Sequence, residues 1–187
     1  MERPYKGKDY IDSRNVIDTI EEFESDREAL VDAVKEAKEA LDEAMNAVLE
    51  AEEAVDLANH GTSQEISEAC AVLNVRKEAF ENAQKAYDVA KADLEEWDDS
   101  PDAENLKELK ELNDKCENEG DWSHGVTLIH ESAFEDYAKQ TAEDLGLISS
   151  DTQWPATCID WGQAADELKQ DYTCIEWGEE TYYMRSY

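Results

Sequence analysis

Two long stretches of the chain repeat apolar residues at alternating steps of three and four. The first repeat runs from Leu30 to Ala58 and the second from Ile66 to Trp97, interrupted in polarity only by Arg76. Such spacing collects the apolar side chains along one side of a helix. Two matched repeats predict an antiparallel coiled coil with arms at about 26–58 and 63–98, each about 50 Å long.

The ends of these arms carry helix signals. Ser25 with Glu28, and Thr62 with Glu65, have the spacing of capping boxes, in which two side chains satisfy backbone N–H groups at a helix start. Between the arms, the Asn-His-Gly segment at 59–61 supplies a helix stop. We therefore expect the arms to be joined by a tight turn.

Shorter helices are predicted on both sides of the hairpin. Asp12 and Ser13 precede apolar residues at helical spacing, which predicts a first helix over 14–23. Pro101 suits the first position of a helix, and the charged pattern behind it predicts a helix through about Cys116. The sequence thus predicts a helical region over residues 1–118.

Residues 119–187 have a different composition, because they contain four of the five tryptophans. An apolar run over 125–130 predicts a strand. Ser132 and Glu135 have capping-box spacing and predict a helix behind it, which Gly146 should end.

The rest of this region predicts a second helix and a β-hairpin. Asp160 can cap a helix, and the strand-like segments 172–177 and 181–185 flank a turn at Gly178. A βααββ module follows over 119–187. The predicted fold class is α+β: an N-terminal antiparallel helical hairpin (coiled coil) followed by a small C-terminal α+β module with an antiparallel sheet.

Five aromatic residues of this module alternate with polar residues, which favours core positions over a binding platform. They are Trp154, Trp161, Trp177, Tyr182 and Tyr183.

Acidic residues dominate the charge of the chain. There are 49 acids and 17 bases, for a formal net charge of -32, while 41% of residues are hydrophobic. The excess is spread along the chain, with 14 acids and three bases in residues 20–58 and 15 acids and three bases in residues 119–187. The charge therefore belongs to segments that should fold, not to a solvating tail.

Cysteine and histidine spacing predicts no metal site. Cys70, Cys116, Cys158 and Cys174 form no C-x-x-C pair, and the three histidines complete no zinc spacing. We expect reduced thiols in packing positions and no cofactor. The chain has neither a long apolar run nor an apolar signal-peptide core, so we expect a cytoplasmic protein without a membrane partner.

The sequence contains no nucleophile elbow, phosphate loop, H-E-x-x-H motif or Gly-rich dinucleotide turn. Acid pairs such as Glu179-Glu180 are common in any chain so rich in carboxylates, so they give little support to glycosidase-type chemistry. We expect a protein that is not an enzyme.

Part of the last third of the chain resembles a known family. The segments 134–138 (Phe-Glu-Asp-Tyr-Ala), 143–146 (Glu-Asp-Leu-Gly) and 158–168 (Cys-Ile-Asp-Trp-Gly-Gln-Ala-Ala-Asp-Glu-Leu), followed by a short hairpin, resemble the C-terminal domain of ArdA-type antirestriction proteins. The resemblance covers under a third of the chain. The family's upstream domains and its central antirestriction motif have no counterpart here, and the helical hairpin stands in their place.

The resemblance implies a protein of phages or mobile elements that imitates bent B-form DNA. Members of that family are dimers, and they occupy the DNA-binding groove of a Type I restriction-modification enzyme. For this chain we expect a basic DNA-binding protein or nuclease complex of a bacterial defence system as partner, with a CRISPR effector as an open alternative. No direct binding of nucleic acid is expected, and a homodimer is left open.

We expect the partner to contact outward acidic residues of the first arm and acidic residues of the module. These are Asp32, Glu36, Glu39, Asp42, Glu43, Glu50 and Glu53 on the arm, and Glu135, Asp136, Glu143, Asp144, Asp166, Glu167, Asp171, Glu179 and Glu180 in the module. The alternative function is that of a coiled-coil adaptor or structural interaction protein, in which acidity serves solubility.

Overall fold

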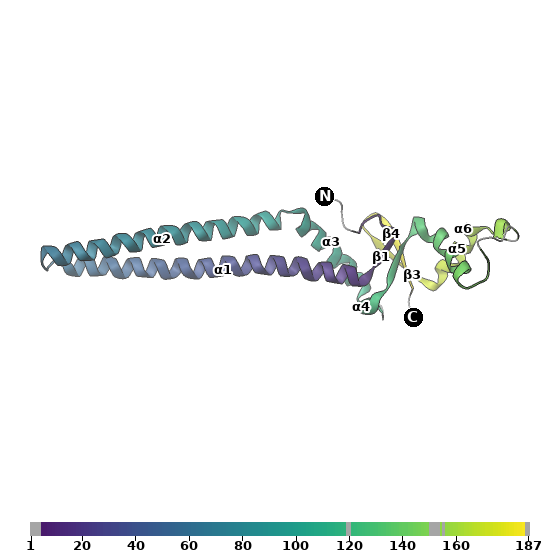
Figure 1. The fold of residues 1–187 in the computed structure, drawn as a ribbon, viewed down its shortest axis with the longest axis horizontal. Helices are drawn as coiled ribbons and strands as arrows, with labels where there is room; N and C mark the ends of the chain where they lie inside the picture. Colours follow the sequence, from purple (N-terminus) through teal and green to yellow (C-terminus); the bar gives the residue numbers. More distant parts are fainter. Residues whose placement is uncertain (1–4, 119–120, 150–153, 155, 186–187) are drawn as a thin grey trace. The chain divides into compact units, whose positions relative to one another are not determined.

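The structure, a computed structural model, describes residues 5–118, 121–149, 154 and 156–185 (Figure 1). Its contacts divide the chain into two compact units, residues 1–23 with 104–187, and residues 24–103. This division differs from the boundary at 118 that the composition suggests, and residues 119–120, which follow that boundary, lie outside the described residues.

The elements in chain order are β1 (Tyr10–Asp12), α1 (Ser13–Ala58), α2 (Ser63–Asp98), α3 (Pro101–Cys116), α4 (Trp122–Gly125), β2 (Thr127–His130), η1 (Glu131–Ala133), α5 (Phe134–Asp144), η2 (Ala156–Cys158), α6 (Trp161–Leu168), η3 (Lys169–Asp171), β3 (Tyr172–Trp177) and β4 (Glu180–Arg185). The η elements are single 3-10 turns.

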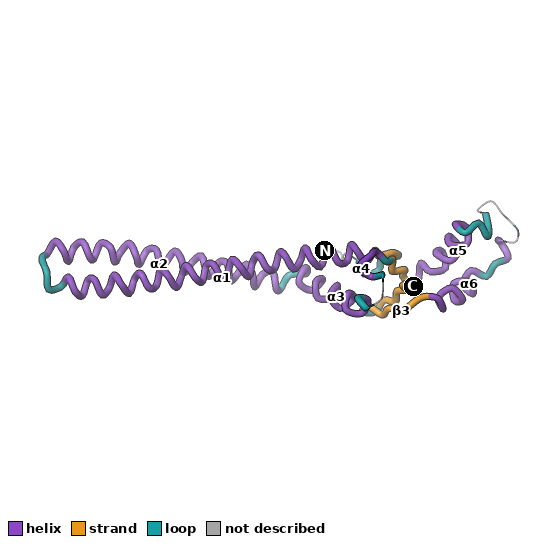
Figure 2. The backbone as a smooth tube through the Cα atoms, turned by 90° about the horizontal axis from the view of Figure 1, so that it is seen from below, coloured by secondary structure: helices purple, strands orange, loops and turns teal. Residues whose placement is uncertain are grey.

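The unit of residues 24–103 is the predicted antiparallel helical hairpin (Figures 1 and 2). The capping box at the start of α2 is present: the Thr62 hydroxyl accepts a hydrogen bond from the Glu65 N–H, and the Glu65 carboxylate accepts one from the Thr62 N–H at 2.7 Å. Gly61 N–H donates to the Ala58 carbonyl at 2.8 Å and closes the turn.

The predicted break between a first helix at 14–23 and a second helix from Ser25 is wrong, because α1 is one continuous helix. The alternating steps of three and four also connect Val16, Ile20, Phe23, Arg27 and Leu30, and neither glycine nor proline interrupts them. Ser25 lies outside this series and is exposed, so its capping signal is overridden by the continuing apolar repeat.

The two predicted apolar repeats form the seam between α1 and α2. Leu41 and Ala51 are buried, and the other seam residues are half-buried, with the exception of the exposed Arg76. Ion pairs bridge the arms beside the seam, where Lys77 Nζ lies 3.2 Å from Glu52 Oε1 and Arg27 Nε lies 2.8 Å from Asp98 Oδ1.

The other unit is built on a four-stranded antiparallel sheet in the order β1-β2-β4-β3. β1 was not predicted: it has three residues, too few to show alternation, and its register pairs Ile11 with Leu128. Because β1 belongs to this sheet, the start of the chain folds with the C-terminal residues.

From Glu104 onward, α3 also belongs to this unit. It buries Leu106, Leu109 and Leu112, and its Glu108 carbonyl accepts a hydrogen bond from Trp177 Nε1 on β3 at 3.0 Å. Buried hydrogen bonds also hold the start of α1 in this unit. The Ser13 hydroxyl donates to the Trp122 carbonyl at 2.7 Å and accepts from the Val126 N–H at 2.8 Å.

The two faces of the sheet carry different apolar residues, as strand alternation requires. On one face Ile129, Tyr172 and Tyr183 pack with Phe134 of α5 and Ala165 of α6 in a single apolar cluster. The opposite face holds Leu128 opposite Met184, and Ile175 opposite Tyr182, all of them buried.

The start of α5 differs from the prediction. Ser132 and Glu135 form no capping box; instead His130 Nδ1 accepts a hydrogen bond from Ser132 N–H at 3.2 Å, the turn η1 intervenes, and Ala133 at the N-cap of α5 has no side-chain bond. The predicted cap at Asp160 is confirmed, since its Oδ1 accepts from Gln163 N–H at 3.0 Å.

Two glycines adopt the left-handed conformation that their turns require. Gly146 has φ 69° and follows α5, where Leu147 N–H bonds to the Ala142 carbonyl in the pattern of a Schellman motif. Gly178 has φ 65° and opens the two-residue turn between β3 and β4, so the predicted hairpin is confirmed.

The predicted core positions of the aromatic residues hold with one exception. Trp177 and Tyr182 are buried and Trp161 and Tyr183 are half-buried, whereas Trp154 is 77% exposed. Burial raises the pKa of the Tyr182 hydroxyl, against the opposing effect of the hydrogen bond from Gly7 N–H.

The cysteines are free. Cys116 is buried as expected, but Cys158 and Cys174 are exposed, so a packing position is wrong for these two.

Phe134→Ala should destabilise the protein by roughly 3–5 kcal/mol, because Phe134 is fully buried against Tyr137, Tyr172 and Tyr183. Trp154→Ala is the matched control and should change the free energy of unfolding by less than about 0.5 kcal/mol. Urea unfolding followed by circular dichroism measures both, and equal losses in the two variants would contradict the assigned core.

Thr62→Val should raise the pKa of Glu65 toward its usual value. The Thr62 backbone N–H and then its hydroxyl lower the pKa of this carboxyl by donating hydrogen bonds to it. The substitution removes the hydroxyl and keeps the N–H, so the rise should be partial. Carbon-13 NMR titration of the Glu65 carboxyl measures it, and an unchanged pKa would show that the hydroxyl bond does not form in solution.

Candidate functional site

The negative charge divides evenly between the two units. Residues 24–103 contain 23 acids and seven bases, a net charge of -16, which leaves -16 for the rest of the chain. α2 has 36 residues, so at a rise of about 1.5 Å per residue the hairpin is about 54 Å long. It therefore carries one net negative charge per about 3.4 Å, the spacing of phosphates along one DNA strand and half the charge density of a duplex.

The heptad register fixed by the seam shows where the acids of α1 lie. With Leu41 at position a and Ala44 at position d, most acids fall at the outward positions c and f. Six of these acids are exposed and are called the acidic row below: Asp32, Glu36, Glu39, Glu43, Glu50 and Glu53. The row follows the same steps of three and four as the seam, with Asn46 as its one interruption, so one carboxylate recurs every 5 Å or so.

Among the described residues the acidic row forms no ion pairs, although Lys35 lies three residues after Asp32 and four before Glu39. Across the described ranges 5–118, 121–149 and 156–185, no Lys, Arg or His lies within ion-pair distance of its six residues. Asp42, at position b, is different: Lys38 Nζ donates to its carboxylate at 2.7 Å. The structure thus brings six of the seven predicted arm residues into one unpaired row and places Asp42 in an ion pair beside it.

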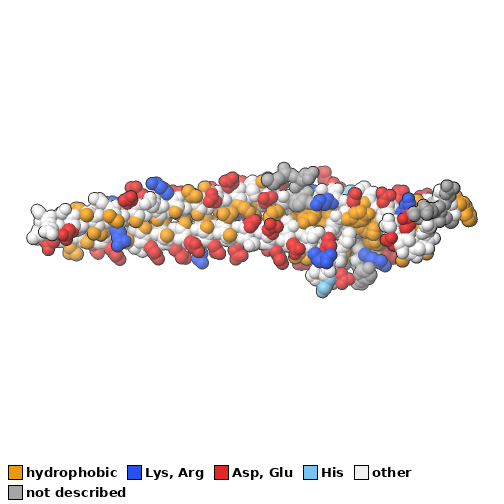
Figure 3. Space-filling model, in the orientation of Figure 1, with side chains coloured by type: hydrophobic (Ala, Val, Ile, Leu, Met, Phe, Trp, Pro, Cys, Tyr) orange, Lys and Arg blue, Asp and Glu red, His pale blue; other side chains and the backbone are white. Residues whose placement is uncertain are grey.

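Three of the five lysines of the hairpin lie at the opposite flank of the seam, the e positions, while Lys35 and Lys85 lie at outward b and f positions. Lys38 on α1 and Lys77 and Lys91 on α2 occupy this flank, and each pairs with an acid. The view in Figure 3 shows acidic side chains along the outer edge of α1 and hydrophobic side chains between the two helices.

Acids also stand where helix electrostatics disfavours them. The last turns of α1, α2 and α5 contain no base, and α5 ends in Glu143 and Asp144. Because the C-terminus of a helix carries partial negative charge, an acid there costs about 0.3–1 kcal/mol. The acids at these C-terminal ends are therefore not positioned to stabilise their helices.

The nine predicted acids of the module lie on several elements. Glu135 and Asp136 are in the first turn of α5, Glu143 and Asp144 in its last turn, Asp166 and Glu167 on α6, Asp171 on η3, and Glu179 and Glu180 at the β3–β4 turn. Glu143 and Glu180 are half-buried and the other seven are exposed.

Some of these acids have local partners. Glu180 Oε2 lies 2.6 Å from His130 Nε2, and Lys169 Nζ lies 3.7 Å from Asp166 Oδ1. Gln163 and Gln140 donate hydrogen bonds to Glu167 and Asp144. In contrast to the acidic row, the module acids do not form a single periodic array.

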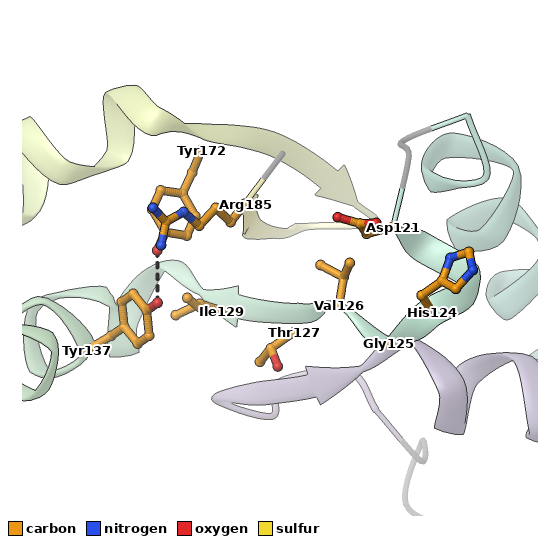
Figure 4. A pocket seen from close by; sticks show the side chains of 9 residues that line it. All are labelled: Asp121, His124, Gly125, Val126, Thr127, Ile129, Tyr137, Tyr172 and Arg185. Atoms are coloured by element: carbon orange, nitrogen blue, oxygen red, sulfur yellow. Dashed lines mark hydrogen bonds between the residues drawn. The ribbon is translucent and has the colours of Figure 1, made fainter. Parts of the chain in front are cut away.

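A pocket of about 490 Å³ in the sheet-containing unit was not predicted (Figure 4). It lies over β2 and is lined by Asp121, His124, Gly125, Val126, Thr127, Ile129, Tyr137, Tyr172 and Arg185. The hydroxyls of Tyr137 and Tyr172 are 2.8 Å apart at one end of it. Sequence could not indicate this site, because its residues come from α4, β2, α5, β3 and β4 and share no spacing.

In the part of the chain that the structure describes, no group of three or more His, Cys, Asp or Glu side chains is arranged to hold a metal ion. None of its helices combines the length and apolar character that crossing a bilayer demands. Comparison of the chain with family models, with curated proteins and with solved structures found no match.

Added NaCl should raise the melting temperature of the protein by at least a few degrees between about 0.01 M and 0.5 M salt. Like charges repel across both arms, and salt shortens the Debye length from about 30 Å to a few ångströms. Thermal unfolding by circular dichroism measures the shift. The salt sensitivity of the melting temperature should shrink when the five glutamates of the acidic row are changed to glutamine. A melting temperature that falls with salt would contradict repulsion between the two arms.

Proposed function

We propose that the protein is a non-enzymatic inhibitor that imitates the charge of DNA and occupies the DNA-binding groove of a bacterial defence enzyme, either a Type I restriction-modification enzyme or a CRISPR effector. The observation that carries the proposal is the acidic row. Six carboxylates project from one helix at regular steps, without ion pairs, on a scaffold held by an apolar seam.

The charge spacing of the hairpin matches that of one strand of a DNA duplex. The hairpin has one net charge per 3.4 Å or so, close to the rise of one strand. A groove whose Arg and Lys side chains bind phosphates would attract such a surface through the same side chains. Association would be fast, and both its rate and the affinity would fall as salt is added.

Two further observations support the proposal. Acids at the C-terminal ends of α2 and α5 oppose the helix dipole, which indicates a requirement other than stability. The resemblance of segments 134–138, 143–146 and 158–168 to ArdA-type antirestriction proteins suggests the same class of target. The resemblance also suggests an origin in a phage or mobile element, and the cytoplasm of the bacterial cell as the place of action.

The immobilised full-length protein should retain DNA-binding proteins from a bacterial lysate and release them on addition of a short DNA duplex. Release is expected because inhibitor and duplex would occupy the same groove. The retained proteins are identified by mass spectrometry. Proteins that stay bound in the presence of excess duplex, and that bind equally in low and high salt, would overturn the proposal.

A charge-matched pair of variants tests the role of the acidic row. Changing Glu36, Glu39, Glu43, Glu50 and Glu53 to glutamine should weaken capture about tenfold or more, since five unpaired charges are lost from one face. The control changes five acids of α2 to their amides: Glu68, Glu78, Glu81, Asp88 and Glu95. Both variants keep the seam, so equal weakening would show that total charge matters and the row does not.

A further inference from the structure

One flank of the hairpin, the g positions, is apolar and nearly free of cations. On α1 all four g positions between residues 33 and 54 are alanine. On α2 the g positions Val72, Ala79 and Ala86 continue this surface, and Val75 and Val89 extend it at the neighbouring c positions. We call this surface the g-side face. The ion pair between Lys77 and Glu52 places the e positions, which include Lys38, Lys77 and Lys91, on the opposite flank.

The valines of the g-side face are exposed in the folded hairpin. Val72, Val75 and Val89 are 52%, 65% and 59% exposed. Scattered exposed apolar residues need no explanation, and Val31 and Met45 are also exposed at e positions of α1. The three valines differ from these in lying on one flank of α2 beside the alanines of α1. Hydrophobic side chains accordingly run along the groove between α1 and α2 in Figure 3.

The seam beneath this face is incomplete as a core. α2 contains no buried residue, and Leu30, Val34, Phe80 and Leu94 remain half-buried although they occupy seam positions. A third helix laid in the groove would cover both the seam and the exposed valines, and alanine side chains permit its backbone to approach closely.

The border of the face determines the chemistry of its occupant. Glu36, Glu43 and Glu50, at c positions of α1, flank the alanines, and the only cation at an inner position of either repeat is Arg76. Asp26 and Asp93 occupy the next g positions beyond the apolar stretch. An occupant with lysine or arginine along the side of its apolar stripe that faces α1 complements this border.

We propose that the g-side face binds an amphipathic basic helix of a partner protein as the third helix of a bundle. The partner's apolar stripe lies on the alanines and valines, and its basic side chains face the glutamates. A second copy of this chain is a poor occupant, because each hairpin has a net charge of -16 and the c-position glutamates of the two copies would face one another. The site adds apolar recognition to the charge imitation proposed above and does not depend on it.

Fluorescence anisotropy with two labelled peptides and the full-length protein tests the proposal. The first peptide, of about 24 residues, places leucine at a and d and lysine at e and g, long enough to cover the apolar stretch. The second has the same composition with the leucines distributed around the helix. In about 0.3 M salt the patterned peptide should bind about tenfold more tightly than the second peptide, or better. The reason is that salt screens the attraction between surface charges but does not weaken apolar burial. Equal binding of the two peptides would overturn the proposal.

Two double variants locate the site. Val72→Asp with Val89→Asp should weaken binding of the patterned peptide about tenfold or more, although the added negative charge alone would strengthen it. Met45→Asp with Leu49→Asp adds the same charge at the e and b positions, where the side chains are 46% and 55% exposed, and should leave binding within about twofold. Circular dichroism is the control for folding, and both variants should keep the helix content of the wild-type protein.

Two outcomes of the variant series would overturn the proposal, one by excluding the site and the other by replacing its occupant. Equal weakening by both double variants would mean that the peptide does not bind the g-side face. Sedimentation that shows a dimer of the wild-type protein, lost in the Val72 and Val89 variant alone, would identify a second copy as the occupant.

Discussion

Burial of the apolar seam between α1 and α2 is the interaction on which the hairpin depends. Both arms are negatively charged, so electrostatics drives them apart, and the bridging pairs at Arg27 and Lys77 are exposed and contribute little. Leu41, Ala51 and the half-buried seam residues provide the attraction that exceeds this repulsion. The seam therefore determines the register, and the register determines which acids point outward.

The same register separates three kinds of surface on one simple scaffold. Outward c and f positions of α1 carry the acidic row, three e positions carry lysines in ion pairs, and the middle g positions of both arms carry alanine and valine. A solvated coiled coil needs charge on its outer face but has no need to divide its flanks in this way. This asymmetry makes the hairpin a candidate for recognition by charge on one side and by apolar contact on another.

The sheet-containing unit depends on contacts that are distant in sequence. Ser13 bonds to Trp122 and Val126, and Trp177 bonds to the Glu108 carbonyl, so the start of the chain and α3 are held against the C-terminal strands. Because the start of the chain and α3 pack against these strands, the division into compact units does not coincide with the composition change near residue 118. The acids of the sheet-containing unit are dispersed over several elements, and some of them are paired. The hairpin is therefore the better candidate for a charged binding surface.

The sequence by itself determined the elements whose signals are periodic or local: the two arms, the capping box at Thr62, the α5 stop at Gly146 and the β3–β4 hairpin. These follow from residues a few positions apart, because heptads, caps and turns are satisfied within one helix or one turn. Only the tertiary structure decided that α1 is continuous through Ser25, that β1 completes the sheet, that His130 caps the turn before α5, and that Asp42 is paired while its neighbours are not. β1 depends on a distant strand, β2, and no spacing along the chain specifies that pairing. The other three are local, but each involves residues with competing local signals or partners, and the geometry of the folded chain decides between them.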